Sequence, residues 1–227
     1  MMISPESYYE EYLKGKTKEQ IMTAIRGLKQ EIGCLKNSME NPHGRIKTVM
    51  HPNEYTRLHW NREYLERAKE AYAEAGGTYT LSKSEEKAAD FDANIDAISK
   101  ITFSIGGYFG GYSNYVVELT DELKAYTKLW EDEEPLLLLD DENKEPYTRD
   151  AFIAALKELH IGEWCRRYST KRFGYMVLDG TQWELEFEYS NGHKPVRFDG
   201  DNSYPYNFDK FQMLFGIDVT EEEDEDE

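Results

Sequence analysis

The residues best suited to bind an anion lie together in one basic and aromatic segment, 164–173. Cations interleaved with aromatic rings suit a phosphate group or a stacked base, because the cations attract negative charge and the rings offer flat apolar faces. The alternative is that the segment neutralises an acidic domain while its rings enter the core. The candidate anion-binding residues are Arg166, Arg167, Lys171 and Arg172.

A row of carboxylates is the second candidate for chemistry. Glu184, Glu186 and Glu188 alternate with large apolar residues, so a strand here would carry all three on one face, about 7 Å apart. Such a row can supply a general acid and base, can be an ordinary solvated face, or can imitate the charge spacing of a nucleic-acid backbone. An acidic loop would extend this surface with Glu131, Asp132, Glu133 and Glu134.

The known motifs for catalysis and cofactor binding are missing from this sequence. The glycine-rich stretch 104–114 lacks the Lys-Ser/Thr ending of a phosphate loop and favours a glycine-bent hairpin instead. The five His are scattered, which argues against a zinc site, and the polar run 199–203 favours a turn over a calcium loop. We therefore expect no catalytic residues, no metal and no cofactor.

The negative charge is spread unevenly along the 227 residues, whose net charge is −18. Residues 1–76 carry 11 acids and 12 bases, whereas residues 77–217 carry 26 acids and 15 bases. The last ten residues, 218–227, hold eight acids and no base, which predicts a disordered acidic tail. Because nonspecific nucleic-acid binding requires positive charge, the overall balance argues against it.

The chain shows no pattern for export or membrane insertion. No apolar run approaches the roughly 20 residues that a membrane span needs, and the first residues have neither a basic start nor an apolar stretch. The two cysteines, Cys34 and Cys165, make no disulfide framework and fit a reducing compartment. We expect a cytoplasmic protein that does not bind membranes.

Two amphipathic helices are predicted in an N-terminal domain, residues 1–77. Thr17 and Gln20 form a capping box, which starts a helix with an apolar stripe at alternating spacings of four and three. The stripe residues are Ile21, Ile25, Leu28, Ile32, Leu35 and Met39. A second helix should run from about Asn53 to Gly76, and its expected stripe is Leu58, Leu65, Ala68, Tyr72 and Ala75.

These two helices should fold into an antiparallel, coiled-coil-like hairpin, because a polar break at 41–44 separates them. Two roles remain open for the hairpin. It can pack on its own domain, or it can serve as a docking arm that allows a homodimer.

Residues 78–217 are predicted to form an α+β domain with an antiparallel sheet and flanking helices. Ser82 begins a third helix that leads into strands at 101–105, 112–119 and 124–130. A short buried strand is predicted over 135–139, and further helices follow Thr148 and Asn207. The order of helix, strands, helix and strands suggests an α-β-α-β repeat.

A meander of three strands is predicted near the end of this domain, over 173–178, 182–189 and 194–198. The strands are separated by Asp179-Gly180 and Asn191-Gly192, and such pairs are the strongest short hairpin signals.

The acidity, the carboxylates and the missing catalytic motifs predict a non-catalytic binding or inhibitor protein that docks on a basic partner. That partner is expected to be a nucleic-acid enzyme whose basic groove the acidic face occupies, as with nucleic-acid mimics of the anti-restriction and anti-CRISPR type. One alternative is an enzyme or binder of a phosphorylated small ligand using segment 164–173. Another is an intracellular scaffold that acts through the helical hairpin.

Overall fold

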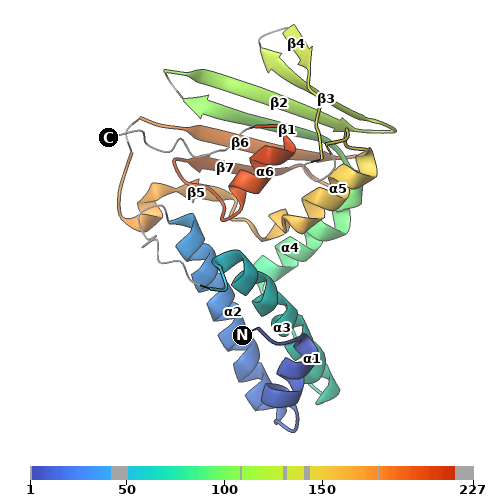
Figure 1. The fold of residues 1–227 in the computed structure, drawn as a ribbon, viewed down its shortest axis with the longest axis vertical. Helices are drawn as coiled ribbons and strands as arrows, with labels where there is room; N and C mark the ends of the chain where they lie inside the picture. Colours follow the sequence, from blue (N-terminus) through green and yellow to red (C-terminus); the bar gives the residue numbers. More distant parts are fainter. Residues whose placement is uncertain are drawn as a thin grey trace. The chain divides into compact units, whose positions relative to one another are not determined.

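The computed structural model describes residues 2–41, 51–107, 109–129, 132–140, 144–177 and 179–217. The protein is α+β and divides into two compact units, Met1–Leu81 and Ser82–Glu227, which we call the helical unit and the sheet unit (Figure 1). The predicted acidic tail and the predicted break at 42–44 lie outside the described residues.

The described part of the helical unit contains α1 (Pro5–Tyr8), the π-helical turn η1 (Tyr9–Leu13), α2 (Lys18–Glu40) and α3 (Glu54–Glu74). The predicted capping box at Thr17 is present, and all six predicted stripe residues of α2 are buried. Helices α2 and α3 contact each other: Ser38 near the end of α2 donates a hydrogen bond to Glu54 at the start of α3, and Arg57 of α3 pairs with Glu31 of α2.

The buried stripe of α3 differs from the prediction at its C-terminal end. Ala75 is exposed because the helix has already ended. Tyr64, in the middle of the helix, is buried although it was not part of the predicted stripe. The N-terminal segment explains this difference: Tyr64 donates its hydroxyl proton to the Ile3 carbonyl oxygen at 2.8 Å and stacks on Tyr8. Packing against the N-terminal segment therefore adds Tyr64 to the buried residues of α3.

The sheet unit starts with α4 (Lys83–Asn94) and the 3₁₀ turn η2 (Ile95–Ala97), and its described strands form one seven-stranded sheet. The strand order is β4-β3-β2-β1-β6-β7-β5, and every neighbouring pair is antiparallel except β5 with β7. The strands are β1 (Ile98–Gly107), β2 (Gly111–Leu119), β3 (Leu123–Leu129), β4 (Asp132–Pro135), β5 (Arg167–Ser169), β6 (Gln182–Tyr189) and β7 (Val196–Asp201).

Helices cover one face of this sheet, which we call the covered face. They are α4, α5 (Arg149–Glu158) and α6 (Phe208–Leu214), and Figure 1 shows all three on the same side of the strands. Phe103 of β1 packs edge-on against Phe211 of α6, and Phe187 of β6 packs edge-on against Phe91 of α4. The core of the sheet unit is therefore largely aromatic.

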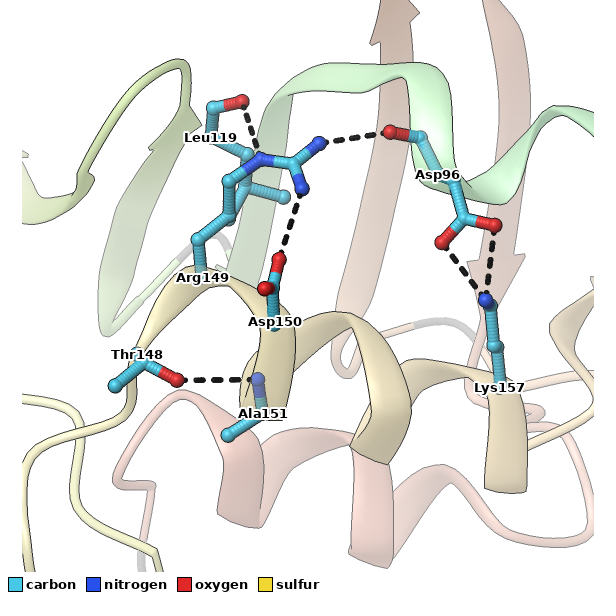
Figure 2. Close-up of polar contacts among 7 residues, drawn as sticks. All are labelled: Asp96, Leu119, Thr148, Arg149, Asp150, Ala151 and Lys157. Carbon is cyan, nitrogen blue, oxygen red and sulfur yellow. Dashed lines mark hydrogen bonds and ion pairs between the residues drawn. The ribbon is translucent and has the colours of Figure 1, made fainter.

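Polar contacts fix α5 against the end of the sheet (Figure 2). Arg149 donates to two backbone carbonyl oxygens, those of Leu119 at 3.3 Å and Asp96 at 2.7 Å. In the last turn of the helix, Lys157 pairs with the Asp96 carboxylate at 2.7 Å. Thr148 caps the helix by accepting the Ala151 N–H.

The predicted three-strand meander is wrong in its first strand. Residues 173–177 form no strand; the chain makes a 3₁₀ turn, η4 (Thr170–Phe173), and reverses at Gly174 with a φ of +84°. The edge of β6 predicted for that strand is taken by β1, which pairs with it over most of its length. Local turn signals could not reveal this partner, because β1 is distant in the sequence.

The predicted buried strand at 135–139 is also wrong. The chain pairs with β3 earlier, through the acidic residues of β4, and Leu137 is 65% exposed whereas Leu138 is buried. The run of four Leu therefore contributes one core residue rather than a strand. The predicted strands in β1, β2, β3, β6 and β7 and the helices after Thr148 and Asn207 are present. The α-β-α-β repeat stays a prediction.

Candidate functional site

The second face of the sheet carries the predicted carboxylates, and we call it the open face because no helix of the sheet unit's described residues packs on it. Along β6, Trp183, Leu185 and Phe187 are buried on the covered face. Glu184 and Glu188, which alternate with these buried residues along the strand, are exposed on the open face. The predicted alternation of this strand is therefore confirmed.

The carboxylate row of β6 is partly neutralised by its neighbours. Glu186 pairs with Arg197 of β7, with 2.8 Å between Oε1 and Nη2. Lys100 of β1 lies opposite Glu188 in the strand register, which places a cation beside the last carboxylate. Glu184 lies opposite Ser104 on one side and Asp199 on the other, and the Asp199 carboxylate lies 3.5 Å from Arg167 of β5.

The acidic run at 131–134 does not join the β6 row. Asp132, Glu133 and Glu134 form β4, the edge strand of the sheet, and Glu131 lies outside the described residues. Three strands separate β4 from β6, which amounts to about 19 Å at the usual strand spacing. Charged residues on an edge strand also prevent pairing with another chain, so this run has a structural role of its own.

The open face is hollowed by a groove of about 740 Å³ over the start of β2. Its floor and walls come from three adjacent strands and from the glycines of the β1–β2 turn. The residues that line it include Thr102, Gly110, Tyr112, Asn114, Val116 and Lys128. Val116 is 5% exposed although it points to the open face, so it forms an apolar base in an otherwise polar surface.

Exposed apolar side chains surround this groove. Leu129, which lines it, is 64% exposed, and Phe109 in the adjacent turn is 84% exposed. Tyr112 donates its hydroxyl proton to Gln182 of β6 at 2.8 Å, and Glu184 follows two residues later on the same face. The structure therefore places the groove next to the Glu184 end of the carboxylate row.

Sequence reasoning missed this groove. The stretch 104–114 was assigned to a glycine-bent hairpin, which is confirmed by the pairing of Gly107 with Gly111. The signal that could have revealed a surface was Phe109 among the turn glycines, because an aromatic side chain in a turn has no core to enter. The predicted strand at 124–130 did not by itself reveal that β3 pairs with β2 in a register that brings Lys128 and Leu129 to the groove.

Most of the basic segment 164–173 belongs to the core and its border. Trp164 and Tyr168 are 5% and 1% exposed, and Trp164 donates its indole N–H to Asn207 at 3.0 Å. Arg167 lies 3.5 Å from the Asp199 carboxylate, and the Arg172 guanidinium lies over the Phe173 ring at 4.5 Å. Lys171 is exposed on η4. The four cations therefore do not converge on one point.

Arg166 of the same segment lies over an aromatic ring of β7. Its guanidinium carbon lies 4.6 Å from the centre of the Phe198 ring. Burial lowers the pKa of Arg166, and the neighbouring Tyr189 and Asp90 partly offset that effect. Burial also raises the pKa of Tyr189 to about 12, against the opposing effect of the Arg166 charge.

Metal binding, disulfide pairing and membrane insertion were each compared with the described residues. No group of three or more His, Cys, Asp or Glu side chains is placed there to hold a metal ion. Both cysteines are exposed and unpaired with each other. Among the described helices none is both long and apolar enough to cross a membrane.

Comparison of the chain with protein-family models, with curated proteins and with solved structures gives no match. The function must therefore be inferred from the geometry and chemistry of the chain's own surfaces.

Proposed function

We propose that this protein is a non-catalytic, acidic binding protein that docks on a basic partner surface through the open face of its sheet. The observation that carries the proposal is the groove over the start of β2, where the exposed Tyr112 lies on the same face of the sheet as the carboxylate of Glu184. Apolar anchors surrounded by charged groups are typical of protein interfaces, in which the anchors supply affinity and the charges steer association.

The expected partner is a basic protein, because the sheet unit carries an excess of acids and the carboxylate of Glu184 is exposed beside the groove. Imitation of a nucleic-acid backbone is a narrower version of the proposal, and it needs an uninterrupted row of charges. The Glu186–Arg197 ion pair interrupts the row on β6. We therefore state the proposal for a basic protein surface, of which the basic groove of a nucleic-acid enzyme is one case.

The test compares three forms of the chain as bait in a lysate of the source cells, at low and high salt. The first is the natural sequence, the second carries Tyr112→Ala and Leu129→Ala in the groove, and the third carries Glu184→Gln and Glu188→Gln on β6. A control form carries Glu122→Gln and Glu158→Gln, which remove two exposed carboxylates away from the open face.

The expected result is one basic protein that the natural sequence and the control retain at low salt and release at high salt. Both open-face forms should lose that same protein while circular dichroism shows that they remain folded. The proposal is wrong if no protein is retained in a salt-dependent manner, or if the open-face forms retain it as well as the control does.

Self-association through the helical unit is a separate proposal, with less support. The apolar stripe of α2 is buried inside that unit, so a homodimer would have to use exposed side chains such as Tyr12, which is 51% exposed. Sedimentation velocity on the natural sequence and on Tyr12→Ala tests this directly. A monomer at tens of micromolar would remove the proposal.

A further inference from the structure

The side chains of the open face form rows that run across four adjacent strands, β6, β1, β2 and β3 (Figure 1). The strand register fixes these rows, because residues opposite each other in neighbouring strands share a face. The first row is Glu188, Lys100, Glu118 and Lys124, and the second is Glu186, Thr102, Val116 and Tyr126. The third is Glu184, Ser104, Asn114 and Lys128, in which the Asn114 amide donates to the Lys128 carbonyl oxygen at 3.3 Å.

The two outer strands of this surface carry opposite charges. β6 supplies a carboxylate to each row, whereas β3 supplies exposed lysines, Lys124 and Lys128, to the first and third rows. Lys124 forms no ion pair with any described residue, and Lys128 lies 3.9 Å from Glu133 Oε1. The surface is therefore acidic along β6 and basic along β3.

This pattern of charge is complementary to itself. A half-turn about an axis that lies along the strands, between β1 and β2, reverses each row, so β6 of one copy faces β3 of a second copy and β1 faces β2. The opposed pairs of charge are then Glu188 with Lys124, Glu184 with Lys128, and Lys100 with Glu118. By symmetry each of these contacts is made twice.

The middle of the surface suits the centre of such an interface. Thr102 and Val116 lie on either side of the axis, and Val116 is 5% exposed. The charged residue of this row, Glu186, already pairs with Arg197 in its own copy. No unpaired charge is therefore placed at the centre, and two sheets that pack face to face with aligned strands lie about 10 Å apart, enough for these side chains.

We propose that a second copy of this chain docks on the open face, which gives a two-fold symmetric dimer with open face against open face. A basic partner finds opposite charge along β6, whereas a second copy finds it along both β6 and β3. The four strands and three rows cover roughly 20 Å by 20 Å, which is a small interface beside the roughly 800 Å² per partner of stable complexes. We therefore expect a weak dimer, with a dissociation constant of about 10–100 µM, that salt weakens further.

The dimer does not depend on the proposed docking to a basic partner. Both associations use Glu184 and Glu188, so one copy cannot take part in both at once. Self-association would therefore withhold the open face from the partner at high concentrations of the chain.

The test is sedimentation equilibrium of the full chain from micromolar to millimolar concentration, at low and high salt. Lys124→Glu places a carboxylate opposite Glu188 twice in each dimer, and should weaken association at least about tenfold. Lys124→Glu with Glu188→Lys restores opposite charges and should restore the dimer. The matched control, Lys124→Glu with Glu184→Lys, has the same net charge but leaves like charges opposed in the first and third rows, and should stay monomeric.

Lys128→Glu with and without Glu184→Lys repeats the test independently in the third row, and circular dichroism checks that each variant is folded. The inference is overturned if the natural sequence stays monomeric throughout, if Lys124→Glu associates as tightly as the natural sequence, or if the matched control restores the dimer as well as the paired reversal does. A dimer that retains no basic protein from a lysate would remove the proposed function alone. Salt-dependent capture of such a protein by a chain that never dimerises would remove this inference alone.

Discussion

The two faces of the seven-stranded sheet use the same strands for opposite purposes. On the covered face, alternate residues of β1 and β6 are large and aromatic and pack against α4 and α6. On the open face, the residues between them are carboxylates, lysines and small polar side chains, with a groove at one end. The stability of the sheet unit therefore comes chiefly from one face, which leaves the other free to evolve a binding surface.

This comparison is tested most strongly by two neighbouring residues of β6. Trp183 is 1% exposed, packs against Phe208 and donates its indole N–H to the Ser203 carbonyl oxygen. Trp183→Ala should lower the free energy of unfolding by about 3–5 kcal/mol, because it leaves a large cavity. Glu184→Ala on the opposite face should leave that free energy nearly unchanged.

Urea unfolding of the full chain, followed by circular dichroism, measures both effects. Comparable losses for Trp183→Ala and Glu184→Ala would show that the open face is buried in solution and would remove the basis of the comparison.

Two arginines, one holding a helix of the covered face and one on the open face, should differ in the same way in their contribution to stability, but by less. Arg149 holds α5 by donating to the carbonyl oxygens of Leu119 and Asp96, as Figure 2 shows. Arg149→Ala should cost about 1–3 kcal/mol, because it removes these bonds and leaves carbonyl groups without their donors. Arg197, whose side chain is 76% exposed, pairs with Glu186 on the open face. Arg197→Ala should leave the urea midpoint unchanged, since exposed ion pairs contribute little.

The same urea titrations measure the effects at these arginines. Arg149→Lys, which keeps the charge but cannot donate to both carbonyl oxygens as a guanidinium does, should also lower the free energy of unfolding. If Arg197→Ala proved as costly as Arg149→Ala, the open face would have to be counted among the stabilising surfaces.

The smallest expected effect is a change in the pH dependence of stability. Burial raises the pKa of Tyr189 to about 12, so the folded chain holds this proton more tightly than the unfolded chain does. Its contribution to stability is complete below about pH 10 and is lost as the pH rises towards 12. Tyr189→Phe should therefore lose thermal stability less steeply than the natural sequence above pH 10.

Tyr126 on the open face provides the comparison, because its pKa is also raised, by burial and by its hydrogen bond to Glu118. Thermal unfolding scans between pH 8 and pH 11 should show a smaller change for Tyr126→Phe. Equal slopes for Tyr189→Phe and the natural sequence would mean that the Tyr189 hydroxyl is solvated.

Much of the fold could be predicted because its signals are local. The capping boxes at Thr17 and Ser82 start helices as expected, and the strict alternation along β6 separates the two faces of the sheet. Such patterns work because the periods of a helix and a strand fix which side chains share a face. The errors came where the partner was distant: β1 occupies the edge of β6 that residues 173–178 had been expected to take.

The candidate sites show the same division. The sequence by itself determined the chemistry of the chain: its acidity, the carboxylates that share one face of β6, and the cations of the segment around Arg166. The tertiary structure alone decided which of them meet. It moved the acidic run of β4 to a distant edge, built a groove from three strands, and placed Arg166 over the Phe198 ring of β7. The physical reason is that strand order and register depend on packing across the whole sheet, which no local pattern encodes.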